Sequence, residues 1–361
     1  MFLLIFILIL VALIWVHELG HFVAAKLFGI RVDEFAIGFP PRLLRVRLGE
    51  TDYTFNLLLV GGFVRIHGED PGTAAHDKRS MANKPRLVQA AVIVAGVVMN
   101  VLFGWLALSA GYMAGAQMVP GTAAFGEVRD AQATITQVLP GSPAQKVGLA
   151  AGDKIESLQT GAQPVKQIQS AEQATGYIAE HQNESLVVTV LRNDEERVFV
   201  AKPEEGFAPG KKALGISMAD VGVLQLPPHL ALLQGAVSAK DMTVSTAQGL
   251  GMFLNSIVRG VADWGSVAGP VGIAGAGGAA VQEGFAAAAF ITALISINLA
   301  IINLVPIPGL DGGRLLIIII EAVIRRPVSP RVVNSLSLAG FALIILLMVV
   351  VTYHDIARLV G

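Results

Sequence analysis

The sequence predicts an α-helical polytopic membrane protein with about four transmembrane helices, a membrane-associated β-hairpin and an inserted α/β domain. Of its 361 residues, 53% are hydrophobic and only 15% are charged, whereas a water-soluble domain carries about 25% charge. A membrane-spanning helix needs roughly 20 mostly apolar residues. Runs without a charged residue occur at 2–16, 87–126, 285–310 and 332–353. The last three are long enough to span a bilayer unaided.

The first run spans a bilayer only if its helix continues through His17, Glu18 and His21 to about Ala25. No Lys or Arg precedes it, so we expect an uncleaved first span rather than a signal peptide. Ionisable side chains at membrane depth are costly and are presumed to be functional. The net charge of −1 gives no indication of nucleic-acid binding, and the absence of cysteine means that any metal is held by histidine and carboxylate groups.

Lys and Arg in short loops mark the cytoplasmic side of a membrane protein. Ten basic residues lie between the first two spans, and three more lie in the connection to the last span. Both chain ends and the long middle region are therefore expected outside the cytoplasm. The expected organisation is spans one and two with the hairpin loop (1–118), an extracytoplasmic domain (119–220), amphipathic surface helices with a glycine-rich loop (221–284), and spans three and four (285–361).

The middle region contains the stretch "ATITQVLPGSPAQKVGLAAGDKIESL", which predicts a strand, a turn, a short helix, a turn and a strand. Ser142 is the expected helix cap, and Pro143 is tolerated in the first helical turn. Gly148 can adopt the left-handed conformation that ends many helices. A further helix and two closing strands are expected downstream. This region resembles a PDZ domain of bacterial envelope proteases. The resemblance implies peptide binding by strand addition, although a structural spacer with an empty groove is the alternative.

The segment after this domain, from about residue 227 to 264, predicts one or two amphipathic helices at the outer membrane surface. The following "GSVAGPVGIAGAGGAA" at 265–280 is very rich in glycine. We expect a loop or a flexible hinge there.

His17, Glu18 and His21 form the pattern H-E-x-x-H. Two histidines four residues apart share one face of a helix and can bind one cation, and the intervening glutamate is the general base in zinc proteases with this pattern. Zinc brings the pKa of its bound water to about 7. A satisfied polar cluster between helices is the alternative explanation.

A zinc enzyme site usually has three protein ligands, and Asp311 is the candidate for the third. It is the only acidic residue between Glu283 and Glu321. Pro306 and Pro308 precede it and cannot continue a regular helix, and broken backbone at membrane depth is tolerated where it lines a cavity. The alternative is that Asp311 only caps the helix that follows.

"HELGH" in the first span, "NLVPIPGLDG" in the third and the intervening PDZ-like domain together resemble the site-2 protease family of intramembrane zinc metalloproteases. The resemblance covers nearly the whole chain, although this chain has room for one PDZ domain where the best-known enterobacterial members have two. It implies one Zn²⁺ per chain. The implied roles are zinc binding by His17, His21 and Asp311, catalysis by Glu18, and substrate binding by Asn303, Pro306 and Asn100.

The stretch "DYTFNLLLVGGFVRIHGE" predicts two apolar strands joined by a turn at Gly61 and Gly62. A helical substrate must be unwound before its peptide bonds can be hydrolysed, and a strand edge could hold the unwound chain. We therefore expect Gly61, Gly62 and Phe63 to contact substrate. The alternative is an ordinary cytoplasmic hairpin.

These features predict a zinc endopeptidase of the bacterial inner membrane that cuts the transmembrane segments of single-span proteins. Family resemblance implies anti-sigma factors that have already been cut outside the membrane, and remnant signal peptides, as substrates. Two other functions remain as alternatives. A non-catalytic PDZ adaptor predicts a degenerate metal motif, and a zinc transporter predicts polar residues along several spans, of which spans two and four have almost none.

Overall fold

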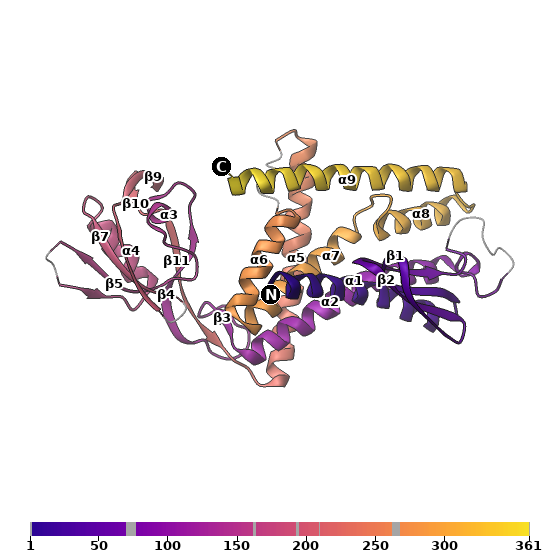
Figure 1. Cartoon of the computed structure of the whole chain (residues 1–361), viewed down its shortest axis with the longest axis horizontal. Helices are drawn as coiled ribbons and strands as arrows, with labels where there is room; N and C mark the ends of the chain where they lie inside the picture. Colours follow the sequence, from indigo (N-terminus) through magenta and orange to yellow (C-terminus); the bar gives the residue numbers. More distant parts are fainter. Residues whose placement is uncertain are drawn as a thin grey trace. The chain divides into compact units, whose positions relative to one another are not determined.

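The structure is a computed structural model that describes residues 2–69, 77–161, 164–192, 195–208, 210–261 and 268–360 (Figure 1). The chain divides into two compact units. One comprises Met1–Gly111 and Gly235–Gly361 and is mainly helical, and the other comprises Tyr112–Gln234 and is mainly β-structure.

Four of the described helices are long and apolar enough to cross a membrane, and they coincide with the four predicted apolar segments. They lie within α1 (Phe2–Leu27), α2 (Arg86–Ala114), α7 (Phe285–Asn303) and α9 (Pro330–Val360). The first helix continues without interruption through His17 and His21. Helix α2 ends at Ala114, well before the charge-free run ends. The next residue, Gly115, has a positive φ of 101°, a conformation that glycine adopts without strain.

The predicted hairpin turn at Gly61 and Gly62 is wrong. Strand β2 (Thr51–Ile66) runs continuously through both glycines, and the turn to β1 (Val32–Leu48) lies at Gly49 and Glu50. The two glycines are instead needed for close packing. A Cβ at Gly61 would lie 2.5 Å from the Phe39 ring, and one at Gly62 would lie 2.9 Å from a backbone oxygen.

The two long strands pair with each other in more than one register. Phe35 of β1 pairs with Val64 in the second half of β2 and also with Tyr53 in its first half. The start of β1 therefore lies between the two halves of β2. Tyr53 and Phe35 also pack against Phe22 of α1, with ring centroids 5.2–6.1 Å apart. This aromatic cluster fixes the sheet against the helix that carries the histidines.

A single helix, α5 (Pro228–Val258), follows the β-rich unit, and α6 (Pro270–Glu283) follows it. The loop or hinge that we expected at 265–280 is therefore wrong from Pro270 onward, while residues 262–267 lie outside the described part. Two features stabilise this glycine-rich helix. Asp355 of α9 accepts hydrogen bonds from the backbone N–H groups of Gly269 (3.1 Å) and Gly272 (2.8 Å). A Cβ at Gly277 would lie 2.2 Å from the Phe6 ring of α1, so glycine permits close packing, as in many membrane helices.

Helix α7 ends at Asn303, and α8 (Asp311–Ile324) begins after a non-helical segment that contains Pro306 and Pro308. The predicted break in the backbone is confirmed. Gly312 and Gly313 allow the first turn of α8 to pack directly on this segment, because a Cβ at either would lie 2.3 Å from a backbone oxygen within it. The "DGG" sequence thus places Asp311 at a closely packed corner.

The larger sheet of the second unit has the strand order β3-β11-β4-β5-β7-β8, and β6 (Lys166–Gln167) pairs with β5. The strands are β3 (Ala116–Met118), β4 (Arg129–Val138), β5 (Lys154–Thr160), β7 (Leu186–Arg192), β8 (Glu195–Ala201) and β11 (Ile216–Leu224). A separate hairpin is formed by β9 (Glu204–Ala208) and β10 (Lys211–Ala213). Every pairing in the sheet is antiparallel.

The predicted order of elements in this unit is confirmed. Helix α3 (Pro143–Val147) lies between β4 and β5, and α4 (Ala171–Glu180) precedes β7 and β8. Ser142 caps α3 by accepting from the backbone N–H of Gln145, and Gly148 ends it with a φ of 91°. The core contains Ile135, Leu158 and Val188 from the sheet together with Tyr177 and Ile178 from α4.

Candidate metal centre

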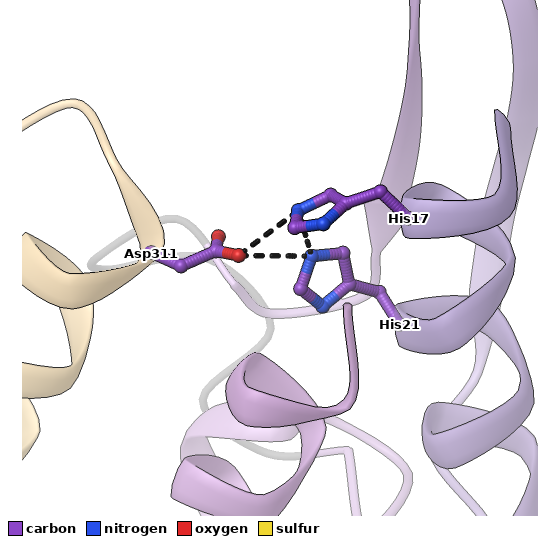
Figure 2. Close-up of side chains that lie close together, drawn as sticks. All are labelled: His17, His21 and Asp311. Atoms are coloured by element: carbon purple, nitrogen blue, oxygen red, sulfur yellow. Dashed lines mark hydrogen bonds and ion pairs between the residues drawn. The ribbon is translucent and has the colours of Figure 1, made fainter. Parts of the chain in front are cut away.

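His17 and His21 project from one face of α1, as their spacing requires. Their Nε2 atoms lie 3.2 Å apart, and both side chains are buried. Asp311 reaches the same point from the start of α8, with Oδ2 3.0 Å from His17 Nε2 and 3.3 Å from His21 Nε2 (Figure 2). The structure therefore brings together three side chains from opposite ends of the chain.

Asp311 does not cap α8. Leu310 occupies the N-cap position, and no side chain makes a capping hydrogen bond there. The carboxylate instead points away from its own helix toward the histidines (Figure 2). The helix-cap explanation for this residue is therefore wrong.

The three facing atoms fit a zinc ion. Zinc ligands of these types lie about 2.0–2.2 Å from the metal in a tetrahedron, which puts neighbouring ligand atoms about 3.3–3.6 Å apart. The three separations in the structure are 3.0, 3.2 and 3.3 Å, so a zinc ion needs these atoms to move apart by only a few tenths of an ångström. Among the described residues, this is the group of histidine and acidic side chains that could hold a metal.

The outer nitrogens of both rings meet residues of α2. His21 Nδ1 lies 2.9 Å from the carbonyl oxygen of Val92, and His17 Nδ1 lies 3.2 Å from the side-chain amide of Asn100. Metal-bound histidines commonly use the second nitrogen in this way, which fixes the orientation of the ring. Neither contact was predicted from the sequence, because each joins two residues that are more than 70 positions apart and lie on different helices.

Helix α2 approaches the imidazoles so closely that Gly96 has no room for a side chain. A Cβ at this position would lie 2.5 Å from His21 Nε2 and 2.8 Å from His17 Cε1. A Cβ at Gly20, on the facing side of α1, would lie 2.4 Å from the Ala95 carbonyl oxygen. The crossing of α1 and α2 therefore depends on glycine at both positions.

We expect the Gly96→Ala variant to lose zinc affinity by at least about 10-fold, because the added methyl group displaces both imidazoles. The same overlap also costs about 1–3 kcal/mol of stability, which exceeds the roughly 0.5–1 kcal/mol gained because alanine is the better helix former, so zinc affinity is compared on folded protein only. Gly275→Ala in α6, where a Cβ meets nothing within 4 Å, is the matched control. Zinc binding measured by chelator competition tests this prediction, and wild-type affinity in Gly96→Ala would contradict it.

Glu18 lies between two cavities. One has a volume of about 210 Å³, and its lining includes His17, Leu310 and Asn303. The other has a volume of about 190 Å³, and its lining includes His21, Phe63 and Val64. Glu18 and Asp311 line both cavities. Glu18 therefore has open space on two sides, next to the three side chains that converge on the candidate metal position.

The other predicted substrate-binding residues differ in their positions. Asn303 and Phe63 line the two cavities beside Glu18, and a Cβ at Gly62 would lie 3.7 Å from Glu18 Cγ. Gly61 packs against Phe39 instead. Pro306 does not belong to the lining of either cavity.

Two charged residues of the second cavity were missed by the sequence analysis. Arg314 of α8 forms an ion pair with Glu69, which follows the end of β2, and both line the cavity that contains Glu18. The sequence signal was a lone arginine three residues after Asp311 in an otherwise apolar segment.

Peptidase family M50 matches residues 5–347 of this chain. The protein named "Putative zinc metalloprotease CPE1693" from Clostridium perfringens is 33% identical over 351 residues, which are 96% of this chain and 95% of the relative. Zinc metalloprotease RasP from Oceanobacillus iheyensis is 30% identical, with 98% of each chain covered. RasP from Shouchella clausii is 29% identical, with 99% of each chain covered.

Proposed function

The chain belongs to peptidase family M50, the site-2 protease family, as a membrane-bound zinc metalloprotease, and we propose that it hydrolyses peptide bonds inside the transmembrane segments of single-span proteins. The observation that supports this most strongly is the meeting of His17, His21 and Asp311 beside Glu18. Three of these residues belong to a helix that is apolar enough to span the membrane.

In the proposed mechanism His17, His21 and Asp311 hold the zinc ion, with the ring and carboxylate orientations described above. When bound, zinc polarises a peptide carbonyl group and makes a water molecule acidic enough to be deprotonated near neutral pH. Glu18 removes the proton from this water molecule and delivers it to the departing amide nitrogen. The position of Glu18 suits both steps, because the residue lines both cavities beside the metal ligands.

We further propose that the second half of β2 holds the unwound substrate. Phe63 and Val64 pair with β1 along one edge, and no other strand pairs with this segment in the part of the chain that the structure describes. Val64 and Glu18 line the same cavity. A peptide added to this edge would have its backbone fixed by hydrogen bonds, with one carbonyl group close to the metal ligands.

The same proposal assigns the remaining features. The β-rich unit would be an extracytoplasmic PDZ domain that binds or screens substrates, and α5 and α6 would lie near the outer membrane surface. Both chain ends would lie outside the cytoplasm of a bacterial inner membrane. Anti-sigma factors that have been cut outside the membrane, and remnant signal peptides, are the proposed substrate classes.

Incubation of the detergent-purified protein with a single-span test substrate, with and without a zinc chelator, tests this function. We expect cleavage that the chelator abolishes and added Zn²⁺ restores. A non-catalytic adaptor would bind the substrate without cutting it under either condition. A zinc transporter would move Zn²⁺ across proteoliposomes and leave the substrate intact.

Removal of the β-rich unit should make the enzyme more permissive. Met118 of β3 and Gly222 of β11 are paired neighbours on antiparallel strands, so residues 119–221 can be replaced by a short turn without separating these strands. We expect the shortened enzyme to retain zinc and to cut substrates that still carry large outer domains. A single PDZ domain would filter less strongly than a pair. A folded, zinc-loaded but inactive product would show that the unit delivers substrate rather than excluding it.

A further inference from the structure

Asn100 lies within the helix bundle at a position that suits a zinc-site residue better than a substrate-binding residue. Its side chain is 0% exposed, and its Nδ2 lies 3.2 Å from His17 Nδ1. It does not belong to the lining of either cavity that contains Glu18. A peptide in those cavities therefore has no direct access to this amide.

The tautomer of His17 determines which kind of hydrogen-bond partner its Nδ1 needs. Nε2 is the atom that faces Asp311 and His21, so it is the atom that would bind the metal. A neutral imidazole that binds a metal through Nε2 carries its proton on Nδ1. The group opposite Nδ1 must then be a hydrogen-bond acceptor.

Asn100 can supply that acceptor. The oxygen and nitrogen of an amide exchange places on a half-turn of the group, and their assignment follows from the hydrogen-bond network. Asn100 Oδ1 is buried and has no hydrogen-bond partner among the described residues. A half-turn places this oxygen opposite His17 Nδ1.

We propose that Asn100 is a positioning residue of the zinc site, which accepts a hydrogen bond from His17 Nδ1–H through Oδ1 and thereby keeps Nε2 free for the metal. This inference rests on the proposed zinc ligation by His17 and His21. It replaces the substrate-binding role that we expected for Asn100 from the sequence.

The second histidine provides an independent parallel. Its Nδ1 faces the carbonyl oxygen of Val92 at 2.9 Å, and a carbonyl oxygen can only accept. His21 is therefore held with its proton on Nδ1 and its Nε2 free. The two rings are oriented in the same way by two residues of α2, one through its backbone and one through its side chain.

The proposal is tested by measuring the zinc affinity of two variants of Asn100 and one variant of its neighbour Ser296. Asn100→Leu keeps the approximate volume and removes the acceptor, and loss of such an outer partner costs about 10–100-fold in metal affinity. Asn100→Asp keeps the acceptor and should bind zinc as tightly as the wild type or more tightly. Ser296→Ala is the matched control. Ser296 donates a hydrogen bond to the backbone oxygen of Asn100 (2.8 Å), so this substitution leaves the Asn100 side chain and its contact with His17 in place. It should leave zinc affinity unchanged.

The measurement is competition with a chromogenic zinc chelator in detergent, so it does not depend on proteolysis. Wild-type affinity in Asn100→Leu would overturn the proposal, and a selective rise in KM with normal zinc binding would restore the substrate-binding role. If the Leu variant does not fold, Asn100→Asp remains decisive, because a 10-fold loss of zinc affinity there contradicts an acceptor role. His17→Ala, measured in parallel, distinguishes a failure of the Asn100 proposal from a failure of the proposed zinc ligation by His17. Unchanged zinc affinity in that variant would refute the proposed ligand set itself.

Discussion

The Glu18→Gln variant is expected to lose cleavage by about 10²–10⁴-fold, the range that a positioned general base contributes, while still retaining one zinc ion per chain. Glutamine has nearly the same shape as glutamate but cannot take up a proton from water. Glu18 is not among the three side chains that converge on the proposed zinc position. Zinc content by atomic absorption and cleavage rate under single-turnover conditions should therefore respond differently.

Glu50→Gln is the matched control for this variant. Glu50 lies in the turn between β1 and β2, where it pairs with Lys26 and Arg79, and partly exposed ion pairs contribute about 0–1 kcal/mol. We expect its cleavage rate to remain within about twofold of the wild type. A Glu18→Gln enzyme that cuts at a comparable rate would remove Glu18 from the mechanism.

Asp311→Asn should weaken zinc binding and activity together, with at least about a 100-fold loss of zinc affinity. The amide has no negative charge and is a poor zinc ligand. A residue that only capped α8 would tolerate asparagine, which is as good an N-cap as aspartate. Glu321→Gln on the same helix is the control, because it removes a carboxylate that pairs with Arg86 (2.7 Å) rather than with the histidines. Equal zinc affinity in Asp311→Asn and the wild type would end the assignment of Asp311 as a ligand.

The sequence alone could predict the parts of this protein that depend on local pattern. The spacing of His17 and His21 requires a shared helix face, and the charge-free runs predict the four apolar helices. The meeting of Asp311 with the two histidines could be predicted only because two histidines leave a zinc site one ligand short, since the local sequence fits a helix cap equally well. The order of strands and helices in the β-rich unit followed from its turn residues, notably Ser142 and Gly148.

The parts that could not be predicted depend on contacts between distant segments. Gly61 and Gly62 have the composition of a turn, but the pairing of β2 with β1 uses them for close approach to Phe39 and to the Ala36 carbonyl group. The glycines of α6 suggested a loop, but its close packing on Phe6 and its contacts with Asp355 stabilise a helix. In each case tertiary packing overrode local preference.

Asn100 illustrates the same limit at the active site. Its place in α2 follows from the sequence, but its partner, His17, lies 83 residues away on another helix. Nothing in the local pattern distinguishes an amide that faces substrate from one that faces a histidine. Only the crossing of α1 and α2, made possible by Gly20 and Gly96, decides between them.

Identification of the scissile bond is the most direct test of the central claim that this zinc protease cuts within a membrane-spanning segment. The purified enzyme and a single-span test substrate would be reconstituted together in liposomes, and the products analysed by mass spectrometry before and after zinc chelation. We predict new termini inside the apolar segment of the substrate, which disappear with the chelator and in Glu18→Gln. Termini found only in the flanking soluble regions, or intramembrane cleavage that persists in both the chelated enzyme and Glu18→Gln, would contradict the account.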